Sequence, residues 1–290
     1  MSTSRSSQRD LLLAFIAFMI ALVLWQMQGL FWFTLPFRWF VTLIHELGHG
    51  TAAVLTGGSF LEFQVTDRGA GLAYTSGGWR WVIIQAGYVG TAVFGAGLLF
   101  LTHRTTQPGR VAIGVGIFIG ILTLAYSGIS LAKLSLVETA LAGVAAVSGI
   151  FLLLTRETDE GRYAGIGLTG LAGLLLVQFA GEGNLLTIAV GLISALLLVW
   201  IGLRVQRDAV IMVLTFLAFL VGLQAITDSW TLFKIVSLPA SMMPHNDASS
   251  MAREVGGTAG MWALIWMVMD IALFGTTAYY VLIHPARRGR

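Results

Sequence analysis

The sequence predicts an all-α polytopic membrane protein with about eight to nine transmembrane helices and one small β-hairpin. Hydrophobic residues make up 57% of its 290 residues and charged residues only 11%, whereas soluble domains carry about 25% charged residues. The mean hydropathy is +0.84, and apolar runs long enough to cross a bilayer as helices recur along the chain. We therefore expect residues 1–290 to form a single integral, multi-pass domain in the lipid bilayer of the cell membrane.

Polar breaks separate apolar runs of about 20 residues, which is the length of a spanning helix. The first run continues into Trp25 with no small-residue cleavage pattern, which favours a retained helix over a signal peptide. Gly116 and Gly120 lie four residues apart, a spacing typical of closely packed transmembrane helices. The expected spans are residues 11–30, 36–56, 79–101, 111–130, 135–155, 163–180, 185–203, 209–227 and 260–283.

Two connections between these spans are longer than tight turns. In residues 59–78, apolar and polar side chains alternate from Leu61 to Val65, and a second short run follows the turn around Gly69, which predicts a β-hairpin. The second connection, residues 228–257, contains two prolines and several ionisable side chains. Neither has the composition of an inert linker.

Charge and cysteine content exclude several classes of function. The formal net charge is +3, but the 17 Lys and Arg residues are scattered along loops and termini and form no dense basic tract, so we expect no nucleic-acid partner. The chain has no Cys. Disulfides, thiolate nucleophiles and cysteine-bound metals are therefore excluded, and any metal must be held by His, Asp, Glu or carbonyl oxygen.

The segment His45-Glu46-Leu47-Gly48-His49, an HExxH motif, lies within the second expected span. Two His four residues apart share one face of a helix, so both imidazoles can bind one metal ion. Chance would produce an HExxH in roughly 0.2% of chains with this His and Glu content. Because three ionisable groups inside a bilayer are also costly without a function, we interpret His45 and His49 as metal ligands.

These features together resemble the site-2 protease family of intramembrane zinc metallopeptidases, most closely its compact branch without a PDZ domain. The resemblance rests on an HExxH inside a spanning helix, a hairpin after it, and a next helix that opens with Gln85-Ala86-Gly87-Tyr88-Val89-Gly90. It is strongest over residues 36–101 and resumes over residues 228–266.

The resemblance implies a metallopeptidase-like core over residues 36–101 and 209–283, with intervening helices over residues 111–203. It implies a Zn²⁺ cofactor held by His45, His49 and a later Asp. It also implies that Glu46 is the catalytic acid and base that activates water for hydrolysis of a peptide bond in or near the bilayer. The expected partner is a membrane-protein or peptide substrate.

The third ligand is where this sequence departs from the family pattern, because no Leu-Asp-Gly element is present. Asn246-Asp247-Ala248 resembles an Asn-or-Ser-Asp-Ala element of the compact branch, so Asp247 is the predicted third ligand. Asp228 is the main alternative, as a ligand, as a partner for a His ring N–H, or as a charge at a helix end. The remaining candidates are His245, Glu254 and Asp270.

Three functions fit these residues. The predicted one is a zinc metalloendopeptidase, with a non-proteolytic zinc-binding membrane scaffold of the same fold as the alternative. A metal-ion transporter would place ionisable residues along several spans, but Glu138 and Asp270 are almost the only ones. Asp270 is equally well explained by structural pairing with a neighbouring helix.

The expected hairpin offers a way to hold a substrate. A transmembrane helix hides its carbonyl groups in internal hydrogen bonds, so it must unwind before hydrolysis. The alternation from Leu61 to Val65 predicts a strand edge on which an unwound segment could pair. Under this hypothesis, proline at Phe63 or Val65 would impair cleavage.

Overall fold

The computed structural model describes residues 12–23, 31–128, 144–146, 148–153, 159–179, 185–236 and 246–284. Four described helices are long and apolar enough to cross a membrane, which supports the expected membrane protein. The expected count of eight to nine spans is not confirmed. These four segments are Pro108–Tyr126, Leu185–Arg204, Arg207–Ile235 and Ala259–Ile283.

Helices dominate the described residues, and one two-stranded sheet interrupts them. Residues 12–23, 144–146 and 148–153 are also helical. The labelled elements are α2 (Phe31–Leu55), β1 (Ser59–Val65), β2 (Gly71–Ser76), α3 (Arg80–Gln85), α4 (Tyr88–Arg104), α5 (Pro108–Tyr126), α7 (Asp159–Phe179), α8 (Leu185–Arg204), α9 (Arg207–Ile235), α10 (Asp247–Val255), α11 (Ala259–Ala278) and the π-helix η3 (Tyr279–Ile283).

Several helix boundaries differ from the sequence-based expectation. Helix α2 begins at Phe31, so Pro36 lies inside the helix instead of in its first turn. The expected span 79–101 is divided at Ala86 and Gly87 into α3 and α4. Helix α9 extends to Ile235 because residues 228–235 contain no Gly or Pro to end it, so Asp228 lies within the helix and not in a loop.

The predicted β-hairpin is confirmed. Strands β1 and β2 are antiparallel, with Val65 opposite Gly71 and Phe63 opposite Ala73, and a bulge lies between Phe60 and Glu62. Phe63 and Val65 are 0% and 3% exposed, because one face of β1 packs into the main hydrophobic core. Backbone N–H of Val65 donates to Thr187 Oγ1 of α8, which ties the hairpin to the helices.

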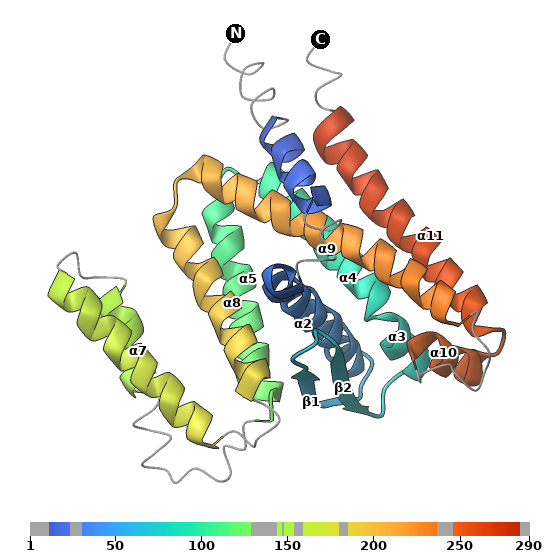
Figure 1. The fold of residues 1–290 in the computed structure, drawn as a ribbon, viewed down its shortest axis with the longest axis horizontal. Coiled ribbons are helices and arrows are strands. Elements are labelled where there is room, and N and C mark those ends of the chain that lie inside the picture. Colours follow the sequence, from blue (N-terminus) through green and yellow to red (C-terminus); the bar gives the residue numbers. More distant parts are fainter. Residues whose placement is uncertain are drawn as a thin grey trace.

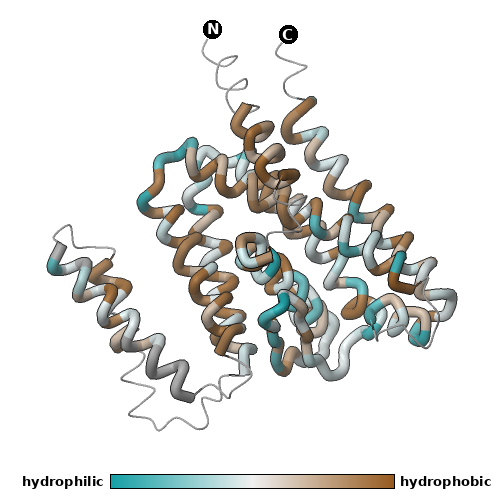
Figure 2. The backbone as a smooth tube through the Cα atoms, in the orientation of Figure 1, coloured by the Kyte–Doolittle hydropathy of each residue, from teal (hydrophilic) through white to brown (hydrophobic). Residues whose placement is uncertain are grey.

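Helix α2 occupies the centre of the molecule in Figure 1. The pair α5 and α8 lies on one side of it, α4, α9 and α11 lie on the other, and the hairpin covers its C-terminal half. Helix α7 lies apart at one edge. Figure 2 shows apolar residues on the outer helices and hydrophilic ones on the hairpin, α10 and the α8–α9 turn. The polar residues of α2 therefore lie between apolar helices.

Helices α5 and α8 make a close contact at Gly116. The four-residue spacing of Gly116 and Gly120 predicts such a contact between transmembrane helices. A Cβ atom built on Gly116 would lie 2.7 Å from the Ala195 carbonyl oxygen and 2.9 Å from a Val199 methyl group. No side chain could be added here without separating the two helices.

We expect Gly116→Leu to destabilise the protein by about 1–3 kcal/mol, because the leucine forces α5 away from α8. Gly114→Leu is the matched control, since a Cβ at Gly114 meets nothing within 4 Å. Thermal unfolding in detergent, followed by tryptophan fluorescence, should show a midpoint several degrees lower for Gly116→Leu alone. Equal midpoints for the two variants would contradict this packing.

Candidate metal centre

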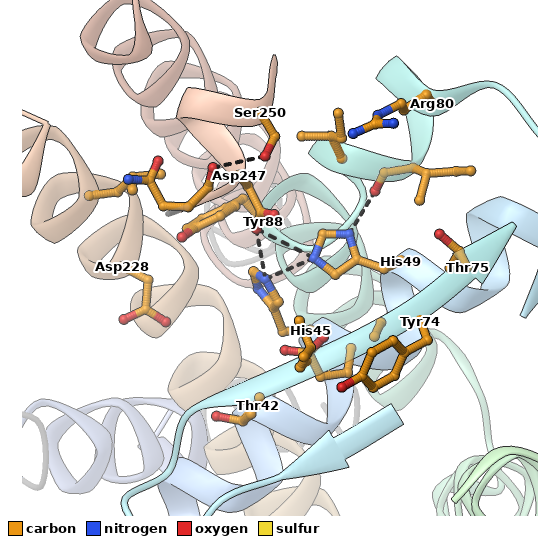
Figure 3. Close-up of a pocket in the computed structure, with 18 of the residues that line it drawn as sticks. Thr42, His45, His49, Tyr74, Thr75, Arg80, Tyr88, Asp228, Asp247 and Ser250 are labelled. Atoms are coloured by element: carbon orange, nitrogen blue, oxygen red, sulfur yellow. Dashed lines mark hydrogen bonds and ion pairs between the residues drawn. The ribbon is translucent and has the colours of Figure 1, made fainter. Parts of the chain in front are cut away.

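Three side chains bring their donor atoms together in one cluster at the centre of Figure 3. Nε2 of His45 and Nε2 of His49 are 3.2 Å apart. Oδ2 of Asp247 lies 3.6 Å from the His45 nitrogen and 3.5 Å from the His49 nitrogen. No other group of three His, Asp or Glu residues with this spacing occurs among the described residues.

The spacing of these donors fits a small tetrahedral cation. Bonds of about 2.0–2.1 Å from zinc to nitrogen and oxygen place neighbouring donors about 3.3–3.4 Å apart. The observed separations of 3.2, 3.5 and 3.6 Å bracket that value. Two imidazoles and one carboxylate are also a donor set that zinc uses in hydrolytic sites, where a fourth position stays open. His45, His49 and Asp247 could therefore hold Zn²⁺.

A hydrogen bond to the backbone orients the second histidine. Nδ1 of His49 lies 2.7 Å from the carbonyl oxygen of Ile83 in α3. A carbonyl oxygen can only accept, so Nδ1 carries the proton and donates a hydrogen bond to the Ile83 oxygen, which leaves a lone pair on Nε2. An imidazole held in this way presents Nε2 to a metal in a defined direction. His49 is 8% exposed, so this geometry is enclosed by protein.

Two glycines allow α2 to approach the junction between α3 and α4. A Cβ built on Gly48 would overlap the Ala86 carbonyl oxygen, and a Cβ built on Gly87 would overlap Nε2 of both His45 and His49. The backbone at Gly87 is in the ordinary right-handed helical region. Glycine is therefore required at position 87 by the space around the two nitrogens and not by the backbone conformation.

Asp247 reaches the cluster because it is the first residue of the short helix α10. The Asn246 side chain accepts from the Ser249 backbone N–H, and the Ser249 hydroxyl in turn pairs with Asn246, which caps this end of the helix. Burial opposes ionisation of Asp247, but the neighbouring His49 and His45 outweigh it and hold the pKa of this carboxyl well below its usual range.

Contacts at the other end of α10 hold it beside the cluster. Arg80 of α3 forms an ion pair of 3.2 Å with Glu254, so Glu254 has a cationic partner away from the donor atoms. Nε1 of Trp262 in α11 donates to the Gly256 carbonyl oxygen at 2.8 Å. The position of Asp247 therefore depends on α3 and α11 as well as on α10 itself.

Glu46 lies next to the cluster and is 5% exposed. The start of β2 covers it so closely that a Cβ on Gly71 would overlap its carboxylate. The hydroxyl of Thr42 donates to the Gly69 carbonyl oxygen at 2.7 Å and fixes the hairpin turn against α2. The carboxylate of Glu46 therefore lies against the start of β2, within electrostatic range of the two histidines.

The cluster opens into a cavity of about 980 Å³. Residues of α2, β1, β2, α3, α4, α9 and α10 line it, including Glu46 and all three donor residues. The cavity is large enough to admit a segment of peptide beside the donor atoms.

The other sequence candidates lie elsewhere. Asp228 lines the cavity from α9, where its Oδ1 accepts from Nε2 of Gln224 at 2.6 Å, but it does not join the donor cluster. Asp270 is fully buried and accepts from the Ser229 hydroxyl at 2.9 Å, which supports the structural pairing of α11 with a neighbouring helix. His245 and Glu138 fall outside the described residues.

Sequence reasoning missed three contributors to this centre. The Ile83 carbonyl carries no side-chain signal, and Gly87 is one of 35 glycines. Tyr88 packs edge-on against the His45 ring, with ring centroids 4.8 Å apart, and stacks on Trp266 at 5.2 Å. Only the similarity of the segment from Gln85 to Gly90 to a known family pointed to this region.

The fold and the donor cluster define a membrane protein with a candidate metal centre. Residues 13–153 match the model of the family described as Peptidase M50B-like, which is the site-2 protease family, so the predicted family is confirmed. No PDZ domain was found. This family points to a membrane metallopeptidase. Searches among curated proteins and solved structures found no match.

We expect Gly87→Ala to lower the zinc content of the purified protein at least tenfold, because the added methyl group occupies the space in front of both Nε2 atoms. Gly97→Ala, within α4, is the matched control, since a Cβ there meets nothing within 4 Å. Elemental analysis of both detergent-purified variants tests this. Full zinc content in Gly87→Ala would show that the metal binds elsewhere.

Proposed function

We propose that this chain is an intramembrane zinc metalloprotease of the cell membrane that hydrolyses a peptide bond in or near a transmembrane segment of a membrane-protein substrate. In this proposal His45, His49 and Asp247 hold Zn²⁺, and Glu46 is the catalytic acid and base. The observation that carries the proposal is the convergence of Asp247 on the two histidine nitrogens. Helix geometry alone pairs His45 with His49, but only the tertiary fold can bring a distant carboxylate to them.

The absence of a Leu-Asp-Gly element is the best support for a non-proteolytic scaffold. That argument is weakened because a carboxylate from Asn246-Asp247-Ala248 lies within 3.6 Å of both histidine nitrogens. The donor set then has the three protein ligands that a hydrolytic zinc site requires. We therefore favour the protease over the scaffold.

The residues around the centre supply the steps of peptide hydrolysis. When bound, zinc supplies Lewis-acid polarisation of a carbonyl group and lowers the pKa of a water molecule to about 7. Glu46 takes a proton from the attacking water and delivers it to the leaving nitrogen. Burial of Glu46 between β2 and α2 shields this transfer from bulk solvent. His49 keeps its orientation through Ile83.

We place the substrate backbone along the free edge of β2. The N–H of Val65 points away from β2 to Thr187, so Val65 and Gly71 form a pair without ladder hydrogen bonds. By the alternation of an antiparallel ladder, the N–H groups of Gly71 and Ala73 then point away from β1. Both residues line the cavity. An unwound peptide could pair with these groups beside the donor cluster.

This placement corrects the strand expected from the sequence. The alternation from Leu61 to Val65 belongs to β1, whose Phe63 and Val65 are buried in the core, whereas the cavity is lined mainly by β2, with Leu61 the one contribution from β1. Proline at either position would remove a buried core side chain, and at Val65 also the hydrogen bond to Thr187, so a loss of cleavage would not report substrate pairing. The informative substitution therefore lies in β2.

The first experiment measures zinc content and peptide cleavage in detergent-purified variants. We expect about one zinc ion per chain, lost in His49→Ala and Asp247→Ala and retained in Asp228→Ala, because only the first two remove donor atoms. Glu46→Gln should keep the zinc and lower the cleavage rate by about 10²–10⁴-fold, since it removes the proton acceptor.

Two results would contradict the proposal in different ways. Zinc retained in Asp247→Ala would remove Asp247 from the ligand set. Equal cleavage by Glu46→Gln and the unmodified chain would show that the activity comes from another site or a contaminant, and the scaffold would then be the better reading.

We expect Ala73→Pro to reduce cleavage at least tenfold while leaving zinc content unchanged. Proline removes the N–H at the free edge, and the β1 ladder survives because that N–H does not take part in it. Ala73→Ser, which keeps the N–H, is the control. Unchanged cleavage of the same peptide by Ala73→Pro would show that substrates do not pair with β2.

A further inference from the structure

The α9 wall of the cavity carries one carboxylate that the proposed reaction does not use. Asp228 lines the cavity, and the amide of Gln224, one turn earlier, donates to its Oδ1 at 2.6 Å. Within the described part of the chain, no hydrogen bond or ion pair reaches its other oxygen. Figure 3 shows Asp228 to one side of the three donor residues. One oxygen of its carboxylate is therefore held by a hydrogen bond, and the other has no partner among the described residues.

The surface around Asp228 suits a long cationic side chain. Asp228, Thr231 and Ile235 follow the spacing of one helical face, and all three line the cavity. This face of α9 therefore offers aliphatic surface next to a carboxylate. Lys and Arg side chains combine an apolar stem with a charged end, so they match both features.

The charges around the cavity leave Asp228 without a counterion. A divalent metal held with neutral imidazoles would be balanced by Asp247 and Glu46, and among the described residues the one Lys or Arg that lines the cavity, Arg80, pairs with Glu254. Arg38, an exposed residue of α2, acts on Asp228 by longer-range electrostatics, and no ion pair joins the two in the described structure. Because an uncompensated charge in a membrane-embedded site is costly, a cationic ligand is favoured there.

The position of Asp228 near one end of α9 also fits a Lys or Arg side chain as the ligand. It lies seven residues before the end of the 29-residue helix α9, which is about 10 Å at 1.5 Å per residue. The carboxylate therefore lies close to one end of a candidate membrane span. Lys and Arg concentrate at the ends of transmembrane segments, where they flank the apolar stretch.

We propose that Asp228 determines specificity by binding a Lys or Arg side chain of the substrate, at the end of its transmembrane segment and close to the scissile bond. This inference rests on the proposed function for the peptide nature of the ligand. It adds a substrate class: membrane-protein segments with a basic residue at the junction of the apolar stretch and the flanking chain.

Binding can be tested separately from cleavage. The protein is the full chain carrying Glu46→Gln, zinc-loaded in uncharged detergent, so that bound peptide stays intact. The probes are fluorescent synthetic peptides with about 20 apolar residues and a single Lys at successive flanking positions, each matched with a peptide that has norleucine there. Fluorescence anisotropy gives the affinity of each pair.

At the preferred position we expect the Lys peptide to bind about tenfold more tightly than its norleucine partner. Adding Asp228→Asn should remove this difference, since it deletes the charge but keeps the shape and an oxygen for Gln224. Adding Asp270→Asn, which deletes a nearby buried carboxylate outside the cavity lining, should preserve it. Zinc content of each variant reports that the site is folded.

Equal affinity of Lys and norleucine peptides at every position would overturn the proposal, as would a Lys preference that survives Asp228→Asn. Cleavage of the same peptides by the unmodified chain separates the two hypotheses. Cleavage with no preference for Lys contradicts the specificity alone. A Lys preference that depends on Asp228, found without any cleavage, supports the binding role and contradicts the protease function.

Discussion

The approach of α2 to the junction of α3 and α4 is the contact on which the candidate metal centre depends. Gly48 lets the two backbones touch, Gly87 leaves the space in front of both histidine nitrogens open, and the Ile83 carbonyl sets the direction of His49. The three effects act within one small region, because α3 ends and α4 begins there. A wider separation of these helices would leave His49 without its acceptor and the nitrogens without an enclosed site.

The third donor comes from a different kind of element. Helix α10 has nine residues, which is too short to be stable alone in water. Its capped start, its ion pair to α3 and the Trp262 hydrogen bond hold it in place, so the position of Asp247 is a property of the assembled fold. The donor cluster therefore joins a rigid central helix to a small peripheral helix, and the cavity opens between them.

The polar residues of the candidate site lie inside a molecule whose outer helices are apolar. Figure 2 places hydrophilic residues on the hairpin and α10, while apolar helices surround the central α2. Buried carboxylates and imidazoles are costly in such surroundings unless each has a partner. The fully buried Asp270 accepts from Ser229, and Asp247 has two histidines. Asp228 has only Gln224, and unlike the fully buried Asp270 it lines the cavity, which is the basis for assigning it a ligand from outside the chain.

The sequence by itself determined the membrane character, the pairing of His45 with His49 and the hairpin after α2, because hydropathy, helical spacing and strand alternation are local properties. The tertiary structure decided which acid meets the histidines. Asp228 and Asp247 were both candidates, and nothing local separates a carboxylate within α9 from one at the start of α10. It also decided the role of Gly87, the break between α3 and α4, and the strand that lines the cavity. These depend on the close packing of segments far apart in the chain, which a one-dimensional pattern does not encode.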